Sequence, residues 1–287
     1  MVKLKNPEIN SILFEKEEQE RLNIEQDYDD YITEKQKYEQ NKEKQQMNPT
    51  LSIITICKNE PYIEETCLSI VNQSNQNFEW IVVDGASTDD TLDKLSKYQK
   101  RMDIFISEED NGTYFAMNKG IHHAHGKYLL FMNGGDLLYS EFTVSDVFPY
   151  LQSDKADIFY GDSYRLFENE DDCFIKTYPD EIQKSFFLTN TLAHQSSFIR
   201  KELFENFGGY SEDFKIVSDK EKWLKFIDSG ATFCHIPKVL SCFRMNGQSR
   251  QQTPALKAEK KKMLEKYFPK NQLYATNIPY LQKIFDR

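Results

Sequence analysis

Polar and acidic residues in this chain follow directly after short apolar runs, where a strand would end. One apolar run continues into Cys57-Lys58-Asn59-Glu60, a second into Asp84, and a third into Asn133-Gly134-Gly135-Asp136. In parallel sheets, ligands bind beyond the carboxyl ends of the strands. These residues therefore predict one ligand site at one edge of a sheet.

The turn ending in Asp136 has the residue types of a metal and diphosphate site. Gly134 and Gly135 carry no side chain, so a diphosphate can approach their backbone closely. Mg²⁺ or Mn²⁺ commonly takes one or two protein carboxylates and completes its shell with phosphate oxygens and water. Gly-Gly-Asp is also an ordinary turn, so the prediction depends on the residues around it.

Asp84 follows the apolar run Trp80–Val83 and precedes a glycine. A carboxylate in this place can accept hydrogen bonds from a base or a ribose, and the alternative is a plain turn aspartate. Ser87 and Asp90 have the spacing of an N-cap and capping box for the next helix. Asp84 lies outside that cap, which favours ligand contact.

The elements that must position these residues alternate between strands and amphipathic helices from Pro49 onward. Apolar runs predict strands at 51–57, 78–83, 104–107 and 128–132, and helical spacing predicts helices at 62–73, 89–99 and 114–123. Strands buried on both faces and alternating with helices indicate an α/β fold with a mostly parallel, doubly wound sheet. The chain lacks G-x-G-x-x-G and G-x-x-x-x-G-K-[ST] motifs, which argues against the common dinucleotide and P-loop sites.

Composition and charge exclude several classes of protein. The 287 residues allow one full-sized domain or two small ones, and the net charge of -10 argues against a nucleic-acid partner. The five cysteines form no C-x-x-C pair, so neither a zinc site nor a disulfide framework is indicated. No apolar run reaches the length of a membrane span and no signal peptide is evident, so we expect a cytoplasmic protein.

The two ends of the chain differ from its centre. Residues 1–48 contain no glycine and are rich in Glu, Gln and Lys, which predicts an N-terminal helical extension. Residues 250–287 contain nine Lys and Arg against three Asp and Glu. This basic C-terminal helical tail (251–287) predicts either a peripheral contact with an anionic membrane surface or a solvated, lysine-rich helix face.

Five motifs occur in order over residues 50–250 and together carry a family resemblance. They are Leu51–Glu60, Phe78–Thr91, Ser107–Gly120, Phe131–Asp136, and His194-Gln195 ahead of Ser218-Asp219. The chain resembles inverting glycosyltransferases of family 2, which have the GT-A fold. It is most similar to bacterial enzymes of exopolysaccharide and lipopolysaccharide synthesis, including the colanic-acid type.

The resemblance implies a domain at 49–250, with a nucleotide-binding half at 49–138 and an acceptor half at 139–250. Asp84 would contact the nucleotide base and Asp136 would bind the metal, Mn²⁺ or Mg²⁺. Two departures matter: Gly135 and Phe115 stand where relatives often carry acidic residues. The remaining nucleotide-sugar contacts implied are Thr55, Cys57, Asn59, Glu60, Asn118, Lys119, Asn133, Gly134, Gly135, His194 and Arg244.

Asp219 matches the family position of the catalytic base. Direct displacement at the anomeric carbon needs a carboxylate to take the proton of the acceptor hydroxyl. The alternative is structural, because Ser218 and Glu221 have the spacing of a capping box and an aspartate is favourable in a first helical turn. Lys119 could equally be a solvated lysine, and His194 a structural residue.

Arg244 and Asn246–Ser249 resemble the loop that closes over the diphosphate, where an arginine can bind phosphate bidentately. His122, His123 and His125 are better explained as a helix end than as a metal cluster.

These residues predict a metal-dependent glycosyltransferase that moves a sugar, from a UDP-sugar by preference, to a hydroxyl of a surface glycan. The expected acceptor is either a glycan or a lipid-linked glycan. The alternatives are a catalytically silent GT-A scaffold that binds a partner through its N-terminal helix, and a sugar nucleotidyltransferase.

Overall fold

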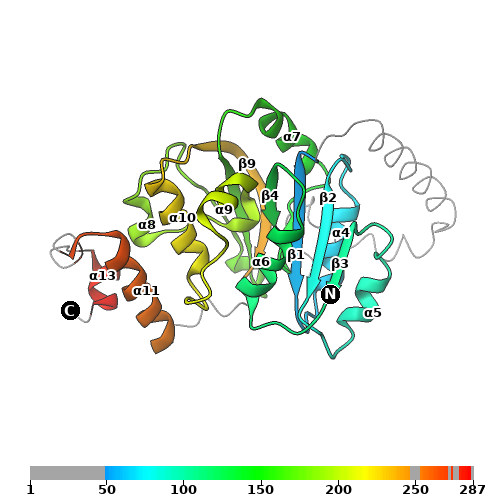
Figure 1. The fold of residues 1–287 in the computed structure, drawn as a ribbon, viewed down its shortest axis with the longest axis horizontal. Helices are drawn as coiled ribbons and strands as arrows, with labels where there is room; N and C mark the ends of the chain where they lie inside the picture. Colours follow the sequence, from blue (N-terminus) through cyan, green and yellow to red (C-terminus); the bar gives the residue numbers. More distant parts are fainter. Residues whose placement is uncertain (1–48, 246–252, 271–272, 274–277, 286–287) are drawn as a thin grey trace.

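A nine-stranded mixed sheet runs through the molecule, with helices on both faces (Figure 1). The computed structural model describes residues 49–245, 253–270, 273 and 278–285. The predicted N-terminal helix and the loop 246–249 lie outside the described residues. The strand order is β3-β2-β1-β4-β8-β6-β9-β5, and β7 pairs with β6.

The first half confirms the predicted alternation of strands and helices. Its strands β3, β2, β1 and β4 are parallel neighbours, and every predicted end lies within three residues of the observed one. The elements are β1 (Leu51–Cys57), α4 (Ile63–Val71), β2 (Glu79–Asp84), α5 (Thr91–Ser96), β3 (Ile104–Ser107), α6 (Thr113–His123) and β4 (Tyr128–Phe131).

The second half makes the sheet mixed. Strand β8 is antiparallel to β4 and β6, whereas β6 runs parallel to β9. The elements are β5 (Leu137–Leu138), α7 (Thr143–Ser153), β6 (Ile158–Leu166), η1 (Glu170–Asp172), β7 (Phe174–Lys176), α8 (Phe186–Thr189), η2 (His194–Ser196), β8 (Ser197–Arg200), α9 (Lys201–Phe207), α10 (Ser218–Asp228) and β9 (Phe233–Arg244).

The core lies on both faces of the sheet, since alternate residues of a strand point to opposite sides. In β1, Ile54 and Ile56 pack in the cluster that includes Met117 of α6, whereas Leu51 and Ile53 pack in the cluster beneath α4. A Cβ on Gly120 would lie 2.3 Å from Cγ2 of Ile54. The glycine therefore permits α6 to lie close against the sheet.

The C-terminal segment packs against the body rather than extending from it. Helix α11 (Pro254–Tyr267) buries Leu256, Met263 and Leu264 in the larger core cluster, and α13 (Pro279–Ile284) lies beside it (Figure 1). Two of its basic side chains are turned inward or paired: Lys260 lines a cavity and Lys266 bonds Glu221. Contact with a membrane stays a prediction, and no helix among the described residues is long and apolar enough to span one.

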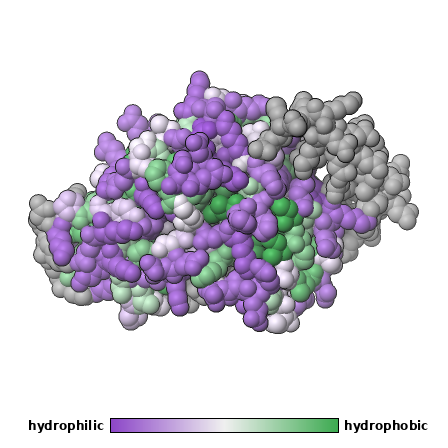
Figure 2. Space-filling model, viewed as in Figure 1, coloured by the Kyte–Doolittle hydropathy of each residue, from purple (hydrophilic) through white to green (hydrophobic). Residues whose placement is uncertain are grey.

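The surface in Figure 2 is mostly hydrophilic, with hydrophobic residues in small separate areas.

The capping box predicted at Ser87 is wrong. Helix α5 begins at Thr91, and the hydroxyl of Ser87 accepts the Asn59 N–H at 2.8 Å and donates to Asp84. The Thr91 N–H is bonded instead by the side chain of Asp89, at 3.0 Å. Ser87 thus joins two loops instead of ending a helix.

The capping box predicted at Ser218 and Glu221 is also wrong. The hydroxyl of Ser218 is buried without a hydrogen-bond partner. The carboxylate of Glu221 accepts hydrogen bonds from Lys266, at 2.7 Å, and from Tyr267. Burial alone would raise the pKa of Glu221, but these two partners hold it below its ordinary value. Glu221 therefore anchors α11 to α10.

Candidate active site

A cavity of about 930 Å³ opens beyond the carboxyl ends of β1 and β4, where the sequence predicts a ligand site. Both halves of the predicted domain contribute to its wall, and so do α11 and α13 through Leu256, Lys260 and Tyr280. Seven of the predicted site residues line it: Cys57, Asn59, Glu60, Asn133, Gly134, His194 and Asp219.

The loops after β1 and β2 are joined by hydrogen bonds at the donor end of this cavity. Asn59 has a φ of 49°, and its side-chain oxygen accepts the N–H of Thr88 at 2.8 Å. The N–H of Glu60 is bonded at 2.8 Å by the hydroxyl of Thr91. These contacts fix the backbone after β1, so that Cys57 to Glu60 form a defined wall. Burial raises the pKa of the Cys57 thiol, which keeps it neutral.

Asp84 and Thr55 lie behind the wall instead of in it. The Asp84 carboxylate is fully buried and accepts hydrogen bonds from the Ser87 N–H at 3.0 Å and the Ser107 hydroxyl at 2.7 Å. Thr55 accepts the indole N–H of Trp80 at 3.0 Å. In this structure both side chains hold loops and strands in place, and their contact with a ligand stays a prediction.

Asp136 lies beneath the Gly134-Gly135 turn and is 4% exposed. One carboxylate oxygen accepts from the Gln195 side chain at 2.7 Å and the other from the Arg244 backbone N–H at 3.0 Å. Burial raises the pKa of Asp136 to about 6, and those two hydrogen bonds limit the rise. The carboxylate is thus held in one orientation by two distant segments.

The oxygens around this turn fit a hard divalent cation. Each oxygen of Asp136 has one N–H donor and keeps a second lone pair, and the side-chain oxygen of Asn133 is buried without a partner. Among the described residues no group of three His, Cys, Asp or Glu could hold a metal alone. This donor set suits Mg²⁺ or Mn²⁺ that shares its shell with phosphate oxygens.

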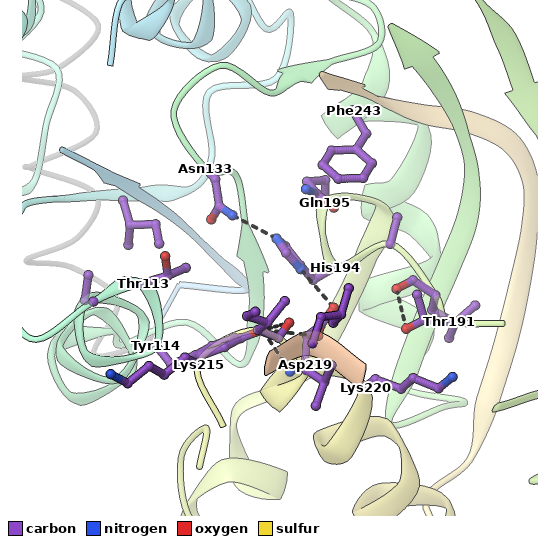
Figure 3. A pocket seen from close by; sticks show the side chains of 18 of the residues that line it. Thr113, Tyr114, Asn133, Thr191, His194, Gln195, Lys215, Asp219, Lys220 and Phe243 are labelled. Carbon is purple, nitrogen blue, oxygen red and sulfur yellow. Dashed lines mark hydrogen bonds and ion pairs between the residues drawn. The ribbon is translucent and has the colours of Figure 1, made fainter. Parts of the chain in front are cut away.

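Asp219 stands in the wall opposite this turn, and its side chain is 21% exposed (Figure 3). The Tyr114 hydroxyl lies 3.2 Å from its Oδ1, and Nδ1 of His194 lies 3.9 Å from its Oδ2. Nε2 of His194 lies 3.1 Å from the Asn133 amide nitrogen. Burial, followed by the charge of Asp219, raises the pKa of Tyr114, so the phenol stays protonated. Oδ2 is the carboxylate oxygen left for a ligand hydroxyl.

Two side chains that are predicted to contact the donor have protein partners in the structure. The Asn118 amide bonds both the N–H and the carbonyl of Tyr210, at 2.7 and 2.9 Å, and its donor contact stays a prediction. Lys119 pairs with Glu108 at 2.9 Å outside the cavity wall.

Arg244, which the sequence predicts to bind phosphate, has protein partners in this structure. Its guanidinium pairs with Glu65, lies 4.0 Å over the Tyr62 ring and donates to the Gly135 carbonyl at 3.0 Å. Arg244 therefore braces the turn that carries Asp136.

Sequence reasoning missed several residues of the site. Tyr114 lies inside the third motif, Ser107–Gly120, but an aromatic on a helix face is usually a core residue. Gln195 was part of a recognised motif without a role assigned to it. Lys176, Lys220 and Lys260 line the cavity, and nothing in the sequence distinguishes a lysine in a cavity from a solvated one.

Comparison with known proteins adds to this geometry. Residues 52–208 match the family model described as "Glycosyl transferase family 2". A PGL/p-HBAD biosynthesis glycosyltransferase of Mycobacterium bovis is 32% identical over 176 residues, which cover 60% of this chain and 67% of that protein. The putative teichuronic acid biosynthesis glycosyltransferase TuaG of Bacillus subtilis is 39% identical over 92 residues, 31% of this chain and 36% of that one.

Solved structures show the same fold at low sequence identity. S. aureus TarS 1-349, in complex with UDP-GlcNAc, superposes with a TM-score of 0.61 at 16% identity and covers 82% of this chain and 70% of its own. The mannosyltransferase PcManGT of Pyrobaculum calidifontis, in complex with GDP-Man and Mn²⁺, has a TM-score of 0.57 at 19% sequence identity. The match covers 83% of this chain and 68% of PcManGT. The predicted α/β GT-A fold is confirmed.

Proposed function

Because the chain belongs to glycosyl transferase family 2 and is a sugar-nucleotide-dependent glycosyltransferase, we propose that it transfers the sugar of a UDP-sugar, with inversion, to a hydroxyl of a surface-glycan acceptor. The observation that carries the proposal is the position of Asp219. Its carboxylate faces the cavity opposite the Asn133-Gly134 turn, with one oxygen open to a ligand. The UDP-GlcNAc bound by TarS and the polysaccharide role in the name of TuaG support the donor and the acceptor class.

Asp219 would act as the general base in a single displacement. The acceptor oxygen forms a bond to the anomeric carbon while the bond from that carbon to the diphosphate oxygen breaks. The acceptor proton passes to Oδ2 of Asp219, and the electron pair leaves with the nucleoside diphosphate. Asp219 lies in the first turn of α10, where the helix dipole favours a negatively charged carboxylate. The Tyr114 hydroxyl at Oδ1 fixes its orientation.

Asp136 and the side-chain oxygen of Asn133 would hold Mn²⁺ or Mg²⁺. Such an ion offsets the charge that develops on the leaving diphosphate. The Mn²⁺ of the PcManGT complex supports a divalent cation in this fold. Gln195 and the backbone of Arg244 keep the Asp136 carboxylate beneath the turn, and the two glycines leave space for phosphate at its backbone.

Calorimetric binding of UDP and GDP, each with Mn²⁺ and with EDTA, tests this function. We expect metal-dependent binding of UDP by the wild type and loss of that binding in Asp136→Ala. Asp219→Asn should bind UDP as the wild type does and lack transfer activity. Failure of the wild type to bind either nucleotide, with metal present, would refute the proposal.

A further inference from the structure

We propose that the acceptor is anionic, and that a phosphate group beside the reacting hydroxyl binds a cluster of four cations on the acceptor side of the cavity. The cation cluster consists of Arg165, Lys176, Lys220 and Lys260, all of which line the cavity. This inference rests on the proposed function, because it names the class of substrate that the same site would accept.

The four cations converge from four separate elements. Arg165 comes from β6, Lys176 from β7, Lys220 from α10 and Lys260 from α11. Burial, with the charges of Lys260 and Lys176, lowers the pKa of Lys220 to about 8, and the charge of Asp219 opposes the shift. Burial and the charge of Arg165 likewise lower the pKa of Lys176. Lys220 is therefore close enough to Lys260 and Lys176 to be repelled by them, and Lys176 is close enough to Arg165.

Within the described ranges the charge of Asp219 acts on Lys220, but no carboxylate forms an ion pair with a lysine of the cluster. Lys176, Lys220 and Lys260 form no ion pair there, whereas nearby Lys184 and Lys266 are paired with Asp228 and Glu221. Arg165 donates to the Tyr178 hydroxyl at 2.9 Å and stacks over Phe243, so its partners are neutral. Lys220 is only 6% exposed and no anion among the described residues bonds it directly, so its charge is costly to bury. A phosphate from a ligand would supply that anion.

The cluster belongs to the acceptor side of the site. Lys220 follows Asp219 in α10, so an acceptor with its hydroxyl at Asp219 would have its next substituent near Lys220. In Figure 3 the Lys220 side chain points away from Asn133 and His194. None of the four cations comes from the loops after β1 and β4, where the donor diphosphate is proposed to bind.

Phosphate fits this cluster better than a carboxylate does. A phosphomonoester carries nearly two charges and three acceptor oxygens, so it can bond several cations at once. A carboxylate has one charge and two oxygens in one plane. The same chemistry could come from a polyol phosphate or from the diphosphate of a lipid-linked sugar, and the assay below separates these two sources.

Binding of small probes to the full chain tests the inference. Glycerol 1-phosphate, inorganic phosphate and glycerol are titrated calorimetrically into protein saturated with UDP and Mg²⁺, so that the donor site is blocked. UDP binding by the wild type is measured first and tests the proposed function separately. We expect both phosphates to bind and glycerol not to bind. Equal affinity for glycerol and glycerol 1-phosphate would overturn the inference while leaving the donor site intact.

Variants assign the binding to the cluster. Lys220→Met and Lys260→Gln should each weaken phosphate binding by about tenfold, as expected for loss of a charge-assisted hydrogen bond. The UDP affinity should stay within about twofold, because only acceptor-side cations are removed. Lys262→Gln, on the exposed face of the same helix α11, is the matched control and should bind phosphate normally. Lys260 is half-buried, so Lys260→Gln tests the cluster even if Lys220→Met fails to fold.

Transfer assays then identify the source of the phosphate. A sugar 6-phosphate, a farnesyl-diphosphate-linked sugar and the neutral sugar are compared as acceptors. Preference for either phosphorylated acceptor supports the inference and names its source. Preference for the neutral sugar, or a tenfold loss of UDP affinity in the lysine variants with unchanged phosphate binding, would overturn it.

Discussion

Replacement of Asp136 by asparagine should change how stability depends on pH. Burial raises the pKa of this carboxyl from its ordinary 3.8 to about 6. Between these two pH values the folded protein keeps a proton that the unfolded chain releases. The contribution of Asp136 to stability is therefore fully present below about pH 4 and is lost as pH rises through 6. The difference in pKa corresponds to about 3 kcal/mol, since each pKa unit is about 1.4 kcal/mol.

Asp136→Asn cannot ionise, so the free energy of unfolding of the variant should rise relative to wild type by about 3 kcal/mol between pH 4 and pH 7.5. Urea denaturation in EDTA at four pH values measures this difference, and Asp93→Asn, at an exposed site on α5, is the control. Mn²⁺ with UDP should stabilise the wild type and not the variant. A wild-type-to-variant difference that is constant across this pH range would refute the burial argument.

Asp219→Asn should lower kcat by about 10²- to 10⁴-fold, the usual contribution of a general base, with UDP affinity unchanged. Steady-state kinetics measure this, with Asp213→Asn at an exposed site as the control, and a loss of kcat below tenfold would exclude Asp219 as the base. Glu259→Gln should lower kcat more than it raises the donor KM, because this carboxylate accepts N–H groups of 215–217 at 2.9 to 3.3 Å, just before Asp219. Gly120→Ala should lower the free energy of unfolding by about 1–3 kcal/mol, because the added Cβ would overlap with Ile54. Denaturation measures this change, and an unchanged denaturation midpoint would contradict the close packing of α6 on the sheet.

The first half of the fold could be predicted because its signals are local. Strands β1, β2 and β4 are buried along their whole length, so each appears as a mostly apolar run. The loops that follow carry the glycines and polar residues that a strand would exclude. The second half was harder to predict, because β8 and β9 enter the sheet in an order that depends on long-range pairing.

The site was only partly predictable, because tertiary partners decide what a polar side chain contacts. Asn118 and Tyr210 are 92 residues apart, so no local pattern shows that the amide is occupied. Glu221 has the spacing of a cap, yet it is bonded by α11, 45 residues on. Asp219 and His194 were identified by family resemblance and indeed line the cavity. Lys220 could be recognised only from its burial in the folded chain.

The short helix η2 connects the two carboxylates on which the proposed chemistry depends. Gln195 donates to Asp136 at 2.7 Å, and the adjacent His194 lies between Asn133 and Asp219. Because two consecutive residues contact both sides of the site, a shift of η2 would move the donor side and the acceptor side together. The backbone N–H of Arg244 holds the other oxygen of Asp136, so the end of β9 fixes the same carboxylate from the opposite direction. The proposed metal-binding carboxylate and the proposed base are therefore positioned by one shared turn, and we expect a substitution in that turn to alter donor binding and transfer at once.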